Sequence, residues 1–143
     1  MNGRTWFVLG AALAGLGVAA GAMGSHMLPG LLAKIFVDEG ELRLALTRQV
    51  QWEIAVRYQV YHGLALLAIG VFTWERKSML AQLAGLSMFV GVLLFSGCLY
   101  GYVLSGQKAL VHVVPIGGVL QLVGWFLLMT AGYSMVPKGE EAK

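Results

Sequence analysis

Four long runs of apolar residues follow one another along the chain, separated by short polar segments. The runs cover residues 5–24, 52–74, 79–104 and 113–135. A helix of about 20 apolar residues crosses the roughly 30 Å hydrocarbon core of a bilayer, so each run is long enough to span a membrane. The pattern predicts an all-α, polytopic membrane protein with four transmembrane helices in an antiparallel bundle, forming a single domain over residues 1–143.

The segment between the first two runs, residues 31–51, is mixed in character. Its apolar residues favour one side, and the polar break Asp38-Glu39-Gly40 divides it. This pattern is typical of an amphipathic segment that lies in the membrane interface and runs into the second span; a solvated loop is the alternative. His26 and Pro29 mark the end of the first helix, because proline disfavours helical geometry in the residue before it. Residues 137–143 form a polar tail.

Composition supports a membrane protein. Hydrophobic residues make up 58% of the chain and charged residues 12%, whereas a soluble domain carries about 25% charged residues. The net charge of +3 is spread over loops and tails without a basic block, which argues against nucleic-acid binding. Cys98 is the single cysteine, so no intramolecular disulfide forms. We expect no metal site and no cofactor, because no Cys/His cluster with zinc-ligand spacing is present.

The first run also has features of a secretory signal peptide. Arg4 precedes the apolar core, and Ala20-Gly21-Ala22 resembles a cleavage site flanked by small residues. Three further spans favour a resident membrane helix, and cleavage stays the alternative.

The distribution of basic residues predicts the orientation. Four spans place both termini on one side of the membrane, and lysines and arginines in short loops favour the cytoplasmic side. The terminal side carries Arg4, Arg76, Lys77, Lys138 and Lys143, and the opposite side carries Lys34, Arg43, Arg48 and Lys108. Five against four favours cytoplasmic termini in a bacterial inner membrane.

Small residues recur at helical spacing in three of the spans. Such stripes let helix backbones approach closely inside a bilayer, where packing rather than hydrophobicity holds helices together. The stripes are more extensive than one bundle needs, so we expect one face to dock a second copy or another membrane protein. The predicted packing positions are Gly10, Ala14, Gly17, Gly21, Gly24, Gly91, Gly117, Gln121 and Gly124.

The start of the second span carries ionisable residues. Glu53 and Arg57 are four residues apart, which suits an ion pair along a helix, and Tyr58 and His62 repeat this spacing. A charged side chain in the bilayer interior is costly and indicates a function. Alternatively, the span begins near Arg57, and the pair lies at the interface with a snorkelling arginine.

Alternating helix directions place most polar residues in one half of the membrane. We therefore expect a shared polar pocket, although His26 and His112 could instead cap helix ends and Ser96 could bond to its own helix. The candidate pocket residues are His26, Glu53, Arg57, Tyr58, His62, Ser96, Tyr100 and His112.

Four short motifs resemble those of the small membrane proteins grouped as domain of unknown function 423. They are residues 21–26 (GAMGSH), 58–62 (YQVYH), 95–100 (FSGCLY) and 115–118 (PIGG) with Gly124-Trp125. The chain departs from the family's usual residues at Met23, Ser25, Cys98 and Val114, and the last departure removes a hydroxyl beside Pro115. The resemblance implies four membrane spans and a bacterial cytoplasmic-membrane location, and it implies no biochemical activity.

These observations favour a binding, assembly or scaffold factor in the lipid bilayer. The alternative is an oligomeric transporter or channel for a small solute or proton, using Glu53, Arg57 and His62. A haem protein with ligands such as His26 and His112 is a third possibility. We do not expect an enzyme, because the sequence shows no nucleophile with a neighbouring base, phosphate loop or metal triad.

Overall fold

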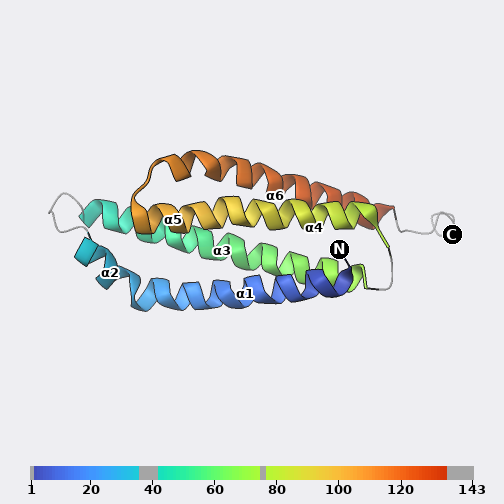
Figure 1. Ribbon diagram of the computed structural model, residues 1–143, viewed down its shortest axis with the longest axis horizontal. Coiled ribbons are helices and arrows are strands. Elements are labelled where there is room, and N and C mark those ends of the chain that lie inside the picture. Colours follow the sequence, from blue (N-terminus) through green and yellow to red (C-terminus); the bar gives the residue numbers. More distant parts are fainter. Residues whose placement is uncertain (1, 36–41, 75–76, 135–143) are drawn as a thin grey trace, which may run out of the picture.

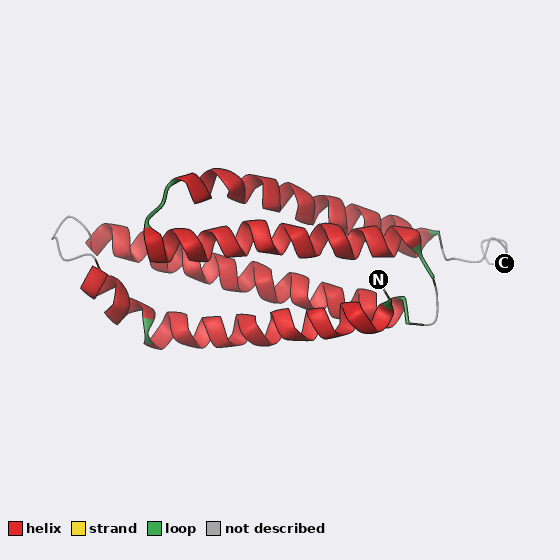
Figure 2. Cartoon of the chain, in the orientation of Figure 1, coloured by secondary structure: helices red, strands yellow, loops and turns green. Residues whose placement is uncertain are grey.

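The computed structural model describes residues 2–35, 42–74 and 77–134, and this part of the chain is helical without any β-strand (Figures 1 and 2). It contains six α-helices and one short π-helix, which we label η2. In chain order the elements are α1 (Gly3–His26), α2 (Leu28–Ile35), α3 (Leu42–Phe72), α4 (Met79–Val92), η2 (Leu93–Gly97), α5 (Cys98–Ser105) and α6 (Ala109–Tyr133).

Four helical segments in the described residues are long and apolar enough to cross a membrane, which confirms the predicted fold class. They are Gly3–His26, Leu46–Phe72, Met79–Ser105 and Ala109–Tyr133. The third segment comprises α4, η2 and α5. The four segments lie side by side and alternate in direction, so that α1 begins at the end of the bundle where α6 finishes (Figure 1).

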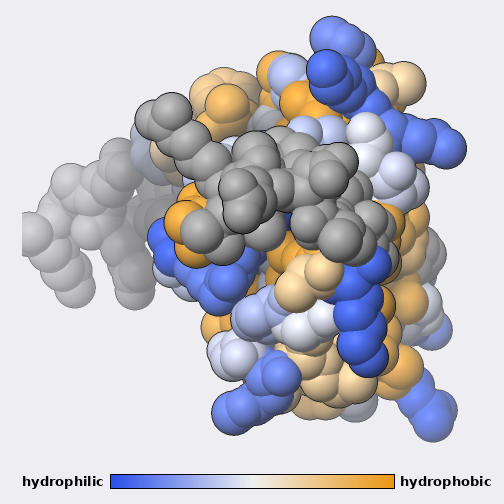
Figure 3. All heavy atoms as spheres, turned by 90° about the vertical axis from the view of Figure 1, so that its left-hand side faces the viewer, coloured by the Kyte–Doolittle hydropathy of each residue, from blue (hydrophilic) through white to orange (hydrophobic). Residues whose placement is uncertain are grey.

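The outside of the bundle is rich in exposed large hydrophobic side chains, among them Leu16, Leu122 and Met129. Viewed from the end that carries α2, hydrophilic side chains gather around this end and hydrophobic ones lie between and behind them (Figure 3). This distribution is the one expected for a bundle whose flanks face lipid.

The region between the first two spans contains two helical pieces. The first is α2, which begins at Leu28, and the second is the start of α3, which begins at Leu42 and continues into the second span. Leu28 and Leu32 are buried in a cluster with Trp52 and Val103. These contacts pack α2 against the bundle. The break at residues 38–40 lies outside the described residues.

The fourth helix begins earlier than predicted. Ala109–Val111 are helical, so α6 starts directly after Lys108 instead of at residue 113. Pro115 therefore lies inside the helix, and His112 belongs to its first turn. The predicted boundary was wrong because three apolar residues that precede His112 were assigned to the loop.

Side-chain caps explain where two spans begin. The Asn2 side chain accepts a hydrogen bond from the backbone N–H of Thr5 (2.9 Å) at the start of α1. Ser78 does the same for Ala81 (3.3 Å) at the start of α4. At the end of α5, Gly106 adopts φ +74°, a left-handed geometry that glycine accepts without steric cost.

Close backbone packing joins α1 to α3. A Cβ atom at Gly10 would lie 2.5 Å from the backbone nitrogen of Leu67, and one at Gly63 would lie 2.8 Å from that of Ala14. The stripe continues towards the end of α1, where a Cβ at Gly17 would meet Val60 at 2.6 Å. A Cβ atom at Gly21 would lie 3.4 Å from the Val56 side chain, and one at Gly24 would lie 2.6 Å from the Trp52 side chain.

A second helix pair, α4 with α6, uses the same device. A Cβ atom at Gly117 would lie 2.8 Å from the carbonyl oxygen of Gly91, and one at Gly124 would lie 3.1 Å from that of Ala84. The stem of Gln121 occupies the space above Gly91. Both stripes therefore pack against other helices of the same bundle.

Trp6 connects the two helix pairs. Its side chain is 1% exposed and belongs to a core cluster with Leu66, Ile69 and Met88. The indole N–H donates a hydrogen bond to Oε1 of Gln82 at 2.8 Å, and its ring lies 2.9 Å from where a Cβ at Gly85 would sit. The core thus includes side chains from α1, α3 and α4.

Candidate functional site

The structure separates the eight predicted pocket residues into two groups. Tyr100 is half-buried and His62 and Ser96 are buried, whereas the other five are exposed: His26, Glu53, Arg57, Tyr58 and His112. The eight therefore do not line one pocket. The reason is helical phase: the buried side of α3 carries Ala55, Gln59, His62 and Leu66, and Glu53 and Arg57 point away from it.

A groove lies beside the buried part of this set, between α3, η2 and α6. Its volume is about 260 Å³, and it is open on one side. The lining residues are Tyr58, His62, Phe95, Gly118, Gln121, Leu122 and Trp125. Three of the four motifs that carry the family resemblance meet here. Five of the seven lining residues belong to them, since they fall within residues 58–62, 95–100 and 115–118 with 124–125.

Two hydrogen bonds hold His62 at the base of this groove. Its Nδ1 lies 2.8 Å from the carbonyl oxygen of Tyr58, and the indole N–H of Trp125 donates to its Nε2 at 3.1 Å. A carbonyl can only accept and an indole can only donate. The network therefore assigns a neutral imidazole with the proton on Nδ1.

Aromatic rings from three helical elements form the walls. The rings of Tyr58 and Phe95 lie 4.8 Å apart at 37°, and those of His62 and Trp125 lie 6.0 Å apart at 59°. Tyr58 also stacks on His62 at 6.2 Å. Gly118 adds no side chain, and a Cβ there would meet the Phe95 ring at 3.7 Å. The hollow thus owes its space to this glycine.

Gln121 brings a polar group to the groove. The sequence analysis had assigned this residue to helix packing. The residue is 3% exposed, and its Nε2 has no acceptor among the described residues. A buried donor without a partner costs about 1–3 kcal/mol, and few occur in native proteins. This amide is the unusual polar feature of the site.

The π-helix η2 shapes the third wall. Ser96 lies within it and donates a hydrogen bond to the carbonyl oxygen of Ala55 on α3 at 2.8 Å. This bond joins Ser96 to another helix. The alternative, in which Ser96 bonds to its own helix, was wrong. Short π-helical turns occur often at functional sites, and this one carries Phe95 to the groove.

Sequence reasoning also missed a polar cluster near the end of the bundle that carries α2. Arg48 was counted as a loop charge, but its side chain is 5% exposed inside α3. Its Nη1 donates to the carbonyl oxygen of Val103 at 3.2 Å, and its guanidinium lies 5.5 Å from the centre of the Tyr102 ring. The signal in the sequence was the repeat of apolar residues between positions 42 and 51, which indicates that Arg48 lies in a helix and not in a loop.

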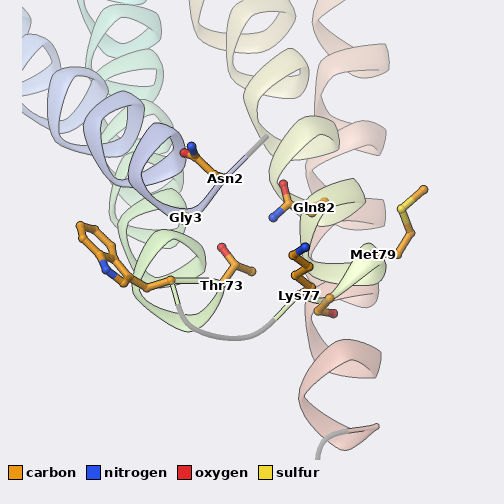
Figure 4. Close-up of a pocket in the computed structure, with 8 residues that line it drawn as sticks. Asn2, Gly3, Thr73, Lys77, Met79 and Gln82 are labelled. Atoms are coloured by element: carbon orange, nitrogen blue, oxygen red, sulfur yellow. The ribbon is translucent and has the colours of Figure 1, made fainter.

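A larger cavity, of about 560 Å³, opens at the end where α1 begins. Lys77 and Gln82 line one side of it, and Asn2 and Thr73 line the other (Figure 4). None of its lining side chains is a buried polar group without a partner among the described residues. We therefore place the candidate site at the groove.

No cluster of three or more histidine, cysteine or acidic side chains occurs in the described ranges. His62 already engages both ring nitrogens, and His26 and His112 are exposed. The groove consequently offers hydrogen bonds and aromatic surface, not metal ligands.

Replacing Trp125 by phenylalanine tests the assigned tautomer. Without the indole donor, Nε2 of His62 loses its partner, so its ¹⁵N chemical shift should move, whereas Nδ1 stays protonated because it still donates to the carbonyl oxygen of Tyr58. The loss of one hydrogen bond should lower the free energy of unfolding by about 1 kcal/mol. Trp74→Phe is the matched control, since Trp74 is exposed, and an unchanged His62 spectrum in Trp125→Phe would contradict the assignment.

Comparison with known proteins finds similar membrane proteins. The sequence model of a family described as a protein of unknown function (DUF423) matches residues 20–118. A UPF0382 membrane protein of Staphylococcus aureus (strain bovine RF122 / ET3-1) is 38% identical over 91% of this chain and 96% of its own length. Another, from Staphylococcus haemolyticus (strain JCSC1435), is 35% identical over 93% and 98%. No solved structure matches.

Proposed function

We propose that this chain, which belongs to the DUF423 family of membrane proteins of unknown function, binds an apolar molecule from the lipid phase and performs no catalysis. The observation that carries the proposal is the groove between α3, η2 and α6. It combines aromatic walls, a glycine-made hollow and a small number of polar groups, which is the usual composition of a small-molecule site.

The depth of the groove supports a ligand that enters from the bilayer. His62 belongs to the span Leu46–Phe72, and Gly118 and Trp125 belong to the span Ala109–Tyr133. All three lie several residues inside their helices, so the opening faces the hydrocarbon region when the four segments span a membrane. Water-soluble molecules reach this depth poorly.

Transport is the second candidate, and the arrangement of side chains favours it less. A proton or solute path through Glu53, Arg57 and His62 needs these groups to face a common channel. Glu53 and Arg57 are exposed on the outside of α3, whereas His62 is buried and hydrogen-bonded to Tyr58 and Trp125. The three groups therefore offer no continuous relay.

The location we infer is a bacterial inner membrane, with the termini in the cytoplasm. Arg48 is buried in the bundle and does not act as a loop charge. Without it, the loops opposite the termini carry three basic residues against five on the terminal side. This difference supports cytoplasmic termini under the positive-inside rule.

A second copy or another membrane protein would have to dock on large apolar side chains, because the small-residue stripes are occupied.

Filling the hollow tests the proposed function. Gly118→Leu places a side chain between the groove walls, because a Cβ there points at the Phe95 ring without a clash. We expect the wild type to bind 2-methylnaphthalene in nanodiscs and to carry a co-purified mass in native mass spectrometry, and the variant to lose both. Gly132→Leu is the control, since no atom lies within 4 Å of its Cβ position.

The outcomes separate clearly. Binding that is retained in Gly132→Leu and absent in Gly118→Leu supports the groove as the site. Equal binding by all three proteins would refute the proposed function, and so would a wild type that binds no apolar ring compound and carries no co-purified mass.

A further inference from the structure

The unpaired amide of Gln121 lies at an unusual depth. Gln121 is the middle residue of the 25-residue helix α6, so it lies about 18 Å from either end of that helix. It lines the groove, and its Nε2 lacks an acceptor among the described residues. Nε2 itself has almost no accessible surface, so it reaches the groove only after a half-turn of the amide, which exchanges the nitrogen with the oxygen.

The depth restricts which acceptor can satisfy this donor. Ester carbonyls of phospholipids lie at the edge of the hydrocarbon core, about 15 Å from its centre. They do not reach a group in the middle of a span. An acceptor at this level must therefore belong to a molecule that resides in the bilayer interior and carries a carbonyl on an apolar body.

The walls restrict the shape of that molecule. Tyr58, Phe95, His62 and Trp125 present rings whose planes differ by 17° to 59° in the contacts described above. Aromatic pairs prefer offset-stacked or edge-to-face contacts, so an aromatic ligand can contact these walls in either geometry. The Nε2 of His62 already accepts from Trp125. This leaves the Gln121 amide as the buried polar group free to bind the ligand.

We propose that the groove binds a flat, apolar carbonyl compound of the quinone class, with the Gln121 amide donating a hydrogen bond to a ring carbonyl. This inference rests on the proposed function and adds the chemical class of the ligand. It concerns binding and assigns no electron transfer to the protein.

Two ring compounds that differ in their carbonyls test the inference. Menadione carries two carbonyls on a methylated naphthalene ring system, and 2-methylnaphthalene carries none. In nanodiscs, the wild type should bind menadione about tenfold more tightly than 2-methylnaphthalene, relative to the Gly118→Leu background that corrects for partition into lipid. Gln121→Met keeps the side-chain length and removes the amide, so it should bind both compounds equally.

Gln59→Met is the matched control. Gln59 is also a buried glutamine within a span, but its amide is paired with the carbonyl oxygen of Leu13 at 2.9 Å, and it does not line the groove. We expect this variant to keep the preference for menadione.

Each result distinguishes the two proposals. If the wild type binds both compounds equally and Gly118→Leu binds neither, the groove is a site but the quinone class is wrong. If Gln121→Met keeps the preference, the amide does not recognise the carbonyl and the inference fails. If neither compound binds the wild type, the proposed function fails with it.

Discussion

A leucine in place of Gly10 is expected to prevent α1 from packing on α3. A Cβ atom at this position would lie 2.5 Å from the backbone nitrogen of Leu67 and 2.6 Å from the carbonyl oxygen of Gly63. Backbone atoms cannot move aside as a flexible side chain can, so the two helices would have to separate. We expect a loss of about 3 kcal/mol or more in the free energy of unfolding, at or above the upper end of overpacking costs.

The measurement is an unfolding titration with sodium dodecyl sulfate in mild-detergent micelles. Trp6 and Trp52 are 1% and 3% exposed, so their fluorescence reports the opening of the bundle. Gly15→Leu is the control on the same helix, because nothing lies within 4 Å of its Cβ position. It should change the stability by less than about 0.5 kcal/mol. Equal midpoints for the two variants would show that the α1–α3 contact is not the one described.

The spans and their close contacts could largely be predicted from the sequence. Hydropathy alone identifies four segments, because an apolar segment in a bilayer must satisfy its backbone hydrogen bonds internally and therefore forms a helix. The glycine stripe of α1 and the Gly91 and Gly117 positions follow from helical spacing. Their partners do not, because spacing within one helix says nothing about which helix faces it. Gly63 on α3, which packs opposite Gly10, was missed for this reason.

The groove could be predicted less well. Tyr58, His62 and the segment containing Phe95 stand out as polar or motif residues, and the structure brings them together. Glu53 and Arg57 were grouped with them because they are near in sequence, yet helical phase points them outward. The π-helix leaves no mark on an apolar run, since every residue from Leu93 to Phe95 fits a regular α-helix equally well. The roles of Gln121 and Trp125 in the groove depend on contacts with other helices, which the sequence of α6 alone does not reveal.

The second large effect is expected at Arg48. Its side chain reaches from α3 to the end of α5, where Nη1 donates to the carbonyl oxygen of Val103 and the guanidinium covers the Tyr102 ring. Arg48→Met keeps most of the apolar stem and removes the donors. The variant should lose about 2–4 kcal/mol in the free energy of unfolding, because a buried acceptor is left without its partner and the cation–π contact disappears.

The comparison with Arg57 isolates the effect of burial. Arg57 lies on the same helix, carries the same group and is exposed, so Arg57→Met should cost less than about 0.5 kcal/mol in the same titration. Arg48→Lys should fall between the two, since an ammonium keeps the charge but cannot place several donors in a planar fork. If both methionine variants unfold at the same detergent fraction, the buried arginine does not join α3 to α5. A cost confined to Arg48 would show that one residue, which the sequence pattern assigns to a loop, holds the end of the bundle above the groove together.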